Sequence, residues 1–152
     1  MNDTGALSEG LRAAEEIVRT LHTLYDGFVR NFERSGVSPL TFFQCWCLDV
    51  MRRRGPLPMS EAAESFSISK QQMTRFADEM EARGLVQKRL SPDDRRVIIL
   101  SLTRAGEQAL DTHLDMMTAE QAERVSRLTP VEARELLECA ARFRELLEKY
   151  WG

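Results

Sequence analysis

Five polar side chains near the start of one amphipathic segment have the chemistry needed to recognise base edges. Segment 69–83 is predicted to be a helix, and its first outward-facing positions are Lys70, Gln71, Gln72, Thr74 and Arg75. Amides pair well with adenine, and cations with guanine or phosphate. A helix in the major groove presents such groups best near its N-terminus. We therefore expect a DNA-recognition helix, with an ordinary solvated helix face as the alternative.

The ends of this helix are marked in the sequence. Ser69 and Gln72 have the spacing of a capping box, which gives Gln72 a second, structural role. Gly84 suits the left-handed residue that follows a helix end. The residues expected to face inward, at helical spacing, are Met73, Phe76, Ala77 and Met80.

A charged hairpin tip follows the helix. Segments 85–90 and 96–102 are predicted to be strands, and the residues between them, Ser91-Pro92-Asp93-Asp94, are typical of a turn. This order of helix, strand, charged tip and strand is the layout of a winged helix-turn-helix. Such a protein places a helix and a hairpin in adjacent DNA grooves, which catalysis does not require.

The tip carries two arginines, Arg95 and Arg96. An arginine there can enter a narrow minor groove, where the negative potential is enhanced. Asp94, two residues before Arg96, can pair with that arginine and fix its direction. Asp93 with Arg95 satisfies the same spacing, and a purely structural turn is the alternative.

Charge is unevenly distributed along the chain. Residues 52–104 contain 11 Lys and Arg against seven Asp and Glu, a net of +4 in a chain of net −3, which leaves −7 for the rest. This asymmetry is expected when one region meets phosphate. Arg52, Arg53 and Arg54 end a predicted helix, where they either contact DNA or neutralise the helix C-terminus.

The remaining elements are predicted to be helices. We expect a long amphipathic helix over 7–32, a break at Gly36, and a second helix from Ser38-Pro39 to Gly55. A short helix over 60–66 precedes the recognition helix. Thr103 and Thr129 are expected to cap two closing helices, which end near residues 128 and 151. The predicted fold class is mainly α with a small β-hairpin wing.

Other kinds of function find little support. The sequence contains no nucleophile–base pattern, no glycine-rich phosphate loop and no metal motif, so neither an enzyme nor a cofactor is expected. No run is long and apolar enough to span a membrane. The polar, acidic start of the chain does not resemble a signal peptide, which favours a cytoplasmic protein.

Several of these residues together resemble the MarR family of bacterial transcription regulators. The pattern consists of Gly84-Leu85-Val86, Asp94-x-Arg96, Leu102-Thr103 and Gly106. The resemblance covers essentially the whole chain. It implies a single domain over 1–152, with a winged core over about 38–104 and dimerisation helices over about 6–34 and 104–151. Ser65-Phe66-Ser67 departs from the family, in which a glycine-containing turn is common.

The resemblance also implies how the chain works. It implies that the five helix positions face the major groove, that Arg96 reaches the minor groove, and that Asp94 braces it. A homodimeric repressor would bind double-stranded DNA at a pseudo-palindrome and would be relieved by a small aromatic or hydrophobic effector. The residues expected at the dimer interface are Leu11, Leu137, Phe143 and Leu147.

The implied effector pocket would be lined by His22, Tyr25, Phe42 and Trp46, although ordinary core packing is the simpler interpretation of such aromatic spacing. Two other functions stay open. One is a thiol-based redox sensor that uses Cys45 or Cys47, although neither has a cationic neighbour in sequence. The other is a winged-helix protein-interaction module that has lost DNA binding.

Overall fold

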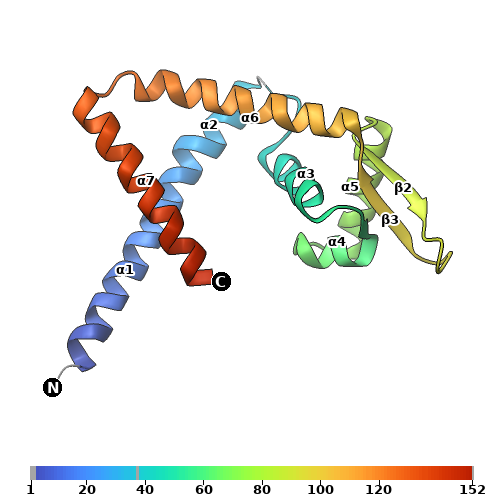
Figure 1. Cartoon of the computed structure of the whole chain (residues 1–152), viewed down its shortest axis with the longest axis horizontal. Helices are drawn as coiled ribbons and strands as arrows, with labels where there is room; N and C mark the ends of the chain where they lie inside the picture. The colour runs from blue at the N-terminus through green and yellow to red at the C-terminus, as the bar shows by residue number, and fades with distance from the viewer. Residues whose placement is uncertain (1–2, 37, 152) are drawn as a thin grey trace. The chain divides into compact units, whose positions relative to one another are not determined.

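The computed structural model describes residues 3–36 and 38–151, without the side chains of residues 3–7. Its elements are α1 (Asp3–Leu24), the π-helical segment η1 (Tyr25–Arg30), α2 (Asn31–Ser35), α3 (Phe42–Arg54), β1 (Leu57–Pro58), α4 (Met59–Ser65), α5 (Lys70–Ala82), β2 (Val86–Leu90), β3 (Ile98–Leu102), α6 (Arg104–Val125) and α7 (Pro130–Trp151). Figure 1 shows the β2–β3 hairpin extending away from the helices α3, α4 and α5. The predicted fold class, mainly helical with a small winged sheet, is confirmed.

The chain divides into two compact units, residues 1–113 and 114–152, and the division falls within α6. The first unit begins with α1, η1 and α2 in succession, where we predicted one regular helix. Gly27 lies in η1, and glycine tolerates a change of helical pitch because it has no β-carbon. Gly36 ends this run in the left-handed conformation, with φ at +63°, as expected.

The start of α3 differs from the prediction. Thr41, not Ser38, is the N-cap, and its hydroxyl and the Gln44 side chain form a reciprocal capping box. Ser38 has Thr41 three residues on, which cannot complete such a box, whereas Thr41 has a glutamine. The Ser38 hydroxyl instead lies 2.7 Å from Nδ1 of His113 and accepts the backbone N–H of Leu40.

The turn between α4 and α5 has a glycine-like backbone without a glycine. Ser67 has a φ of +53°, in the left-handed region, and the backbone N–H groups of Ser67 and Ile68 donate to Glu64 and Ala63 of α4. Ser67 therefore occupies the conformation that a glycine would adopt most easily. The Ser65-Phe66-Ser67 segment therefore forms its turn with a left-handed residue although it contains no glycine.

The sheet has three antiparallel strands in the order β1-β3-β2. Val86 pairs with Leu102 and Leu90 with Ile98, as expected for the predicted hairpin. The two-residue strand β1 was not predicted, because Leu57-Pro58 is too short to show an alternating pattern. Its Leu57 pairs with the fully buried Leu100. The core of this unit also contains Leu48, Met51, Met73, Met80 and Leu110.

The junction between α5 and β2 holds the start of α6. The Thr103 hydroxyl donates to the carbonyl of Gly84 at 2.7 Å and accepts the N–H of Gly106 at 3.0 Å, so the predicted cap is confirmed. A β-carbon on Gly106 would lie 2.1 Å from the carbonyl oxygen of Leu85. The Leu102-Thr103-x-x-Gly106 pattern is therefore explained by close backbone packing.

The second unit contains the end of α6 and α7. Thr129 and Glu132 form the predicted capping box, in which the backbone N–H of Thr129 donates to the Glu132 carboxylate at 2.8 Å. None of the described α7 side chains is buried. None of the described helices is long and apolar enough to cross a bilayer.

Candidate nucleic-acid interface

The polar face of α5 lies as the sequence predicted. Lys70, Gln71, Gln72, Thr74 and Arg75 are all exposed. The opposite face, Met73, Phe76, Ala77 and Met80, is buried in the core. The helix therefore presents its first turn and a half to solvent on a rigid support.

Two of these five side chains also have bonds within the helix. The side-chain oxygen of Gln72 accepts the N–H of Ser69 at 2.9 Å, as the capping box requires. The hydroxyl of Thr74 donates to the carbonyl of Lys70 at 2.9 Å. Gln72 keeps its amide donors and Thr74 keeps a lone pair, so each still has one kind of contact to offer.

The wing tip is held differently from the prediction. The Asp94 carboxylate accepts the backbone N–H of Arg96 at 2.9 Å, and no described ion pair joins it to the guanidinium. The carbonyl of Asp94 also accepts the N–H of Val97 at 2.9 Å. In a tight turn, an aspartate reaches the N–H two residues on more easily than a flexible guanidinium. Asp94 therefore shapes the turn, and Arg96 extends from it without a carboxylate partner in the part of the chain that the structure describes.

Ion pairing separates the basic residues of the winged core into two groups. Five are bonded to side chains or carbonyls of the chain itself: Arg52, Arg53, Arg54, Arg83 and Lys88. Six have no such partner among the described residues: Lys70, Arg75, Arg89, Arg95, Arg96 and Arg104. The second group lies on α5, the hairpin and the start of α6.

Arg52, Arg53 and Arg54, at the end of α3, all have carboxylate partners within the fold. Arg52 bonds to Asp49 and Asp111 at 2.9 and 2.8 Å, and Arg53 to Asp49 at 2.9 Å. Arg54 joins α3 to Glu61 of α4 at 3.0 Å. All three cations are therefore paired in the free chain, and contact between them and DNA stays a prediction.

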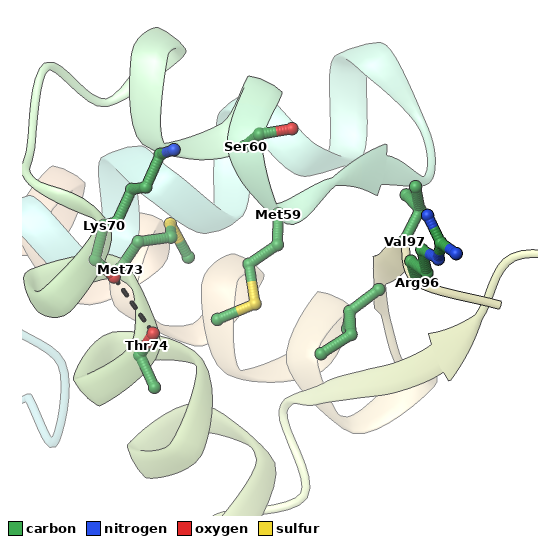
Figure 2. A pocket seen from close by; sticks show the side chains of 8 residues that line it. Met59, Ser60, Lys70, Met73, Thr74, Arg96 and Val97 are labelled. Atoms are coloured by element: carbon green, nitrogen blue, oxygen red, sulfur yellow. Dashed lines mark hydrogen bonds between the residues drawn. The ribbon is translucent and has the colours of Figure 1, made fainter. Parts of the chain in front are cut away.

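A cavity of about 310 Å³ is lined by residues of α4, of α5 and of the segment 96–98, where the wing tip joins β3. Figure 2 shows Lys70 and Arg96 on opposite sides of it, with Met59 between them. Met73, Val97 and Ile98 complete an apolar lining, and Ser60 and Thr74 add hydroxyls. The recognition helix and the wing thus face one shared concave surface that carries positive charge. Sequence patterns gave no sign of Met59 or Ser60, which join this surface only through the fold.

No ring contact among the described residues joins any two of the four residues expected in an effector pocket. Trp46 contacts the rings of Phe43 and Phe66, at centroid distances of 6.0 and 5.7 Å. His22 and Tyr25 are exposed on the N-terminal helical run, and Phe42 is exposed at the start of α3. The cavity beside α5 contains none of the four. Their role stays a prediction.

His113 was missed by the sequence reasoning. It is 1% exposed and packs edge-on against Phe32, with 5.1 Å between the ring centroids, and its Nδ1 contacts the Ser38 hydroxyl. Its Nε2 has no partner among the described residues. Burial lowers the pKa of the imidazole, although the negative charge of Glu33 acts in the opposite direction. A single histidine in a helical pattern gives no sign of such burial.

The buried cysteines are poor redox sensors. Burial raises the pKa of Cys45 to about 11 and that of Cys47 to about 12. A sensor needs an accessible thiolate, and both thiols are protonated and inaccessible at neutral pH. No described cluster of His, Cys, Asp and Glu has the composition of a metal site.

The residues expected at a dimer interface differ in exposure. Leu11 is 64% exposed and Leu137 70% exposed, whereas Phe143 and Leu147 are half-buried. Leu136, Leu146, Tyr150 and Trp151 also leave large apolar surfaces on α7 uncovered. Patches of this kind mark interaction surfaces.

Comparison with known proteins agrees with this geometry. Residues 35–97 match the sequence profile of the MarR family. The HTH-type transcriptional repressor MdtR of Bacillus subtilis is 30% identical over 120 residues, which cover 79% of this chain and 76% of MdtR. The HTH-type transcriptional repressor NicR of Pseudomonas putida is 29% identical over 64% of this chain and 62% of NicR.

Solved structures show the same fold. Wild-type MarR from Escherichia coli superposes with a TM-score of 0.67 at 21% identity, covering 88% of this chain and 95% of MarR. The YusO protein of Bacillus subtilis superposes with a TM-score of 0.65 at 24% identity, covering 95% of this chain and 99% of YusO. With the exposed polar face of α5 and the basic wing beside it, these matches establish that the chain belongs to the MarR family and is a non-enzymatic, DNA-binding transcription regulator.

Proposed function

We propose that this regulator is a homodimeric repressor that binds a pseudo-palindromic site in double-stranded DNA. In each protomer, Lys70, Gln71, Gln72, Thr74 and Arg75 of α5 lie in the major groove. Arg95 and Arg96 of the wing lie in the adjacent minor groove, and Asp94 holds the tip in shape. The protein acts in the cytoplasm, together with the DNA that it binds.

The observation that carries this proposal is the distribution of unpaired cations. Arg52, Arg53 and Arg54 are bonded to Asp49, Asp111 or Glu61, so phosphate would have to displace a carboxylate from them. Lys70 and Arg96 have no such competitor among the described residues, and both line the concave surface between α5 and the wing. Contact with phosphate releases counterions and supplies much of the affinity for DNA.

Three observations support a dimer that represses. Several described apolar side chains on α1 and α7, such as Leu11 and Leu137, are largely exposed in the single chain, and a second copy would cover them. Regulators of the MarR family bind DNA and typically act as dimers, and a two-fold protein matches a two-fold DNA site. The relatives MdtR and NicR are named as repressors.

Selection of bound sequences from a random duplex library tests this proposal. The full chain is used at near-physiological salt, after sedimentation has established its oligomeric state. We expect an inverted repeat whose half-sites lie about one helical turn apart. A single unrepeated site would contradict the dimer. Failure to enrich any motif would contradict sequence-specific binding by the free protein.

We also propose that a small aromatic or hydrophobic effector releases the repressor from DNA. The exposed aromatic side chains of Tyr25, Phe42 and Trp46 supply apolar surface for such a molecule. Displacement of a labelled duplex by a panel of aromatic compounds tests this part. An active compound should lose its effect on a Trp46→Ala variant that still binds DNA, and an unchanged response would remove Trp46 from the effector site.

A further inference from the structure

Lys88 lies at the centre of a charged cluster that joins the recognition helix to the wing. Its ammonium lies 2.6 Å from the Asp78 carboxylate and 2.8 Å from the Glu81 carboxylate. The same Glu81 carboxylate accepts the backbone N–H of Lys88 at 3.0 Å. Glu81 therefore binds both the backbone and the side chain of one residue.

The cluster holds β2, the edge strand that leads to the wing tip, against α5. β2 is an edge strand, so the N–H groups along its outer side lack a strand partner. Glu81 satisfies one of them at Lys88, the third residue of the strand. Among the described residues, Lys88 is the position furthest along β2 that is hydrogen-bonded to α5. Beyond it, Arg89 and Leu90 are exposed and the chain continues to the wing tip.

The carboxylates lie next to the DNA-facing part of α5. Asp78 and Glu81 are three residues apart and share one side of the helix. Asp78 comes one turn after Thr74 and Arg75. The cluster thus ties the helix, just beyond its proposed base-contacting residues, to the strand that leads to Arg95 and Arg96.

We infer that Lys88 is a positioning residue, which fixes the wing relative to the recognition helix so that both reach their grooves at once. This inference rests on the proposed DNA-binding surface. Lys88 would otherwise be counted as a phosphate ligand, because it is a cation beside the wing. However, two carboxylates already neutralise it, and its side chain is only 23% exposed. Hydrogen bonds to Asp78 and Glu81 also raise the pKa of Lys88, so the ammonium stays charged.

The test compares Lys88→Met with Arg96→Met in the full chain. Each variant is titrated against the selected duplex and against an unrelated duplex over a range of salt. The ratio of specific to non-specific affinity separates an effect on the position of the wing from an effect of charge. The two carboxylates that Lys88→Met leaves unpaired repel both duplexes, so their charge lowers both affinities and not the ratio. A simple loss of stability lowers the folded fraction and leaves the ratio unchanged. Thermal melting confirms that each variant is folded.

We expect Lys88→Met to lower the ratio about tenfold, near the low end for the loss of one base contact. Its salt dependence with the unrelated duplex should match that of the parent. Arg96→Met should reduce the salt dependence of DNA binding, since it removes a cation that is proposed to lie in the minor groove between the phosphates. Lys88→Arg keeps the positive charge and should show the same ratio of specific to non-specific affinity as the parent. A Lys88→Met variant with reduced salt dependence and an unchanged ratio would make Lys88 a phosphate ligand and overturn the inference.

The Glu81→Gln variant tests the positioning role of Lys88 independently. If Glu81 only repels DNA, its removal strengthens binding to both duplexes equally. If it positions the wing through Lys88, the ratio falls, and the double variant Glu81→Gln/Lys88→Met loses no more than Lys88→Met alone. An unchanged ratio in both single variants, with an effect of Arg96→Met, would refute the positioning role alone. No effect of Arg96→Met would refute the proposed surface itself.

Discussion

Replacing Arg96 by alanine should weaken binding to the selected duplex with little change in stability. The guanidinium is exposed and has no carboxylate partner among the described residues, while the backbone N–H that holds the tip to Asp94 is kept. One groove contact is worth about 1–3 kcal/mol, or roughly 5- to 150-fold in affinity per protomer. A proposed dimer that loses two such contacts should also lose about 1.8 from the slope of log K against log salt.

Arg53→Ala is the matched control. Arg53 carries the same charge and its side chain is 63% exposed, but its Nε donates to the Asp49 carboxylate at 2.9 Å. We therefore expect it to leave both affinity and salt slope nearly unchanged. Fluorescence anisotropy of a labelled duplex at several salt concentrations measures both quantities. If Arg53→Ala reduces the slope as much as Arg96→Ala, intramolecular pairing does not determine which cations meet DNA.

Three further predictions concern the stability of the fold and the proposed dimer. Gly106→Ala should lower the free energy of unfolding by at least about 2 kcal/mol, because its β-carbon would lie 2.1 Å from the Leu85 carbonyl oxygen. An unchanged melting temperature would mean that α6 can shift away from Leu85 without cost. Leu137→Asp should convert the proposed dimer to monomers in sedimentation experiments, since it would place a charge in an apolar interface; a stable dimer would exclude Leu137 from that interface. His113 has a lowered pKa when folded, so the unfolded chain binds the proton more readily and stability should fall as the pH drops below about 6.5. Denaturant unfolding between pH 7.5 and 5.5 should show a smaller loss for His113→Gln, and an equal loss would assign the acid sensitivity to other groups.

The elements that carry the polar face of α5 could be predicted from local patterns. Ser69 and Gln72 form a capping box over three residues, and the buried Met73, Phe76 and Met80 recur at helical spacing. Such signals depend only on the backbone geometry of one helix. The hairpin was also predictable from a local pattern, since turn residues separate two short segments in which apolar residues begin and end the strand.

The interactions that position the site are mostly between residues distant in sequence, and local patterns do not reveal them. Lys88 meets Asp78 across ten residues, Arg52 meets Asp111 across 59, and His113 meets Ser38 across 75. Whether a cation is paired or free depends on these contacts, so the sequence could show a basic region but not which of its members remain available. β1 was missed because its pairing partner, Leu100, lies in a later hairpin.

Errors over short distances arose where two local options competed. Ser38-Pro39 looked like a helix start, yet Thr41 with Gln44 forms the reciprocal box. Asp94 could bond either the guanidinium or the N–H of Arg96, and the turn geometry favours the N–H. In both cases the residue types were interpreted correctly, and the backbone decided between their possible partners.

Hydroxyl-radical footprinting of the selected duplex tests the central claim most directly, because the radical reports access to the sugar edge of the minor groove. With the parent protein, we expect one protected minor-groove segment beside each major-groove half-site, in a two-fold symmetric pattern. With Arg96→Ala, at concentrations that restore full binding, the wing-dependent protection should disappear while the half-site contacts stay. Protection that is identical for the two proteins would show that the wing does not enter the groove and would contradict the account.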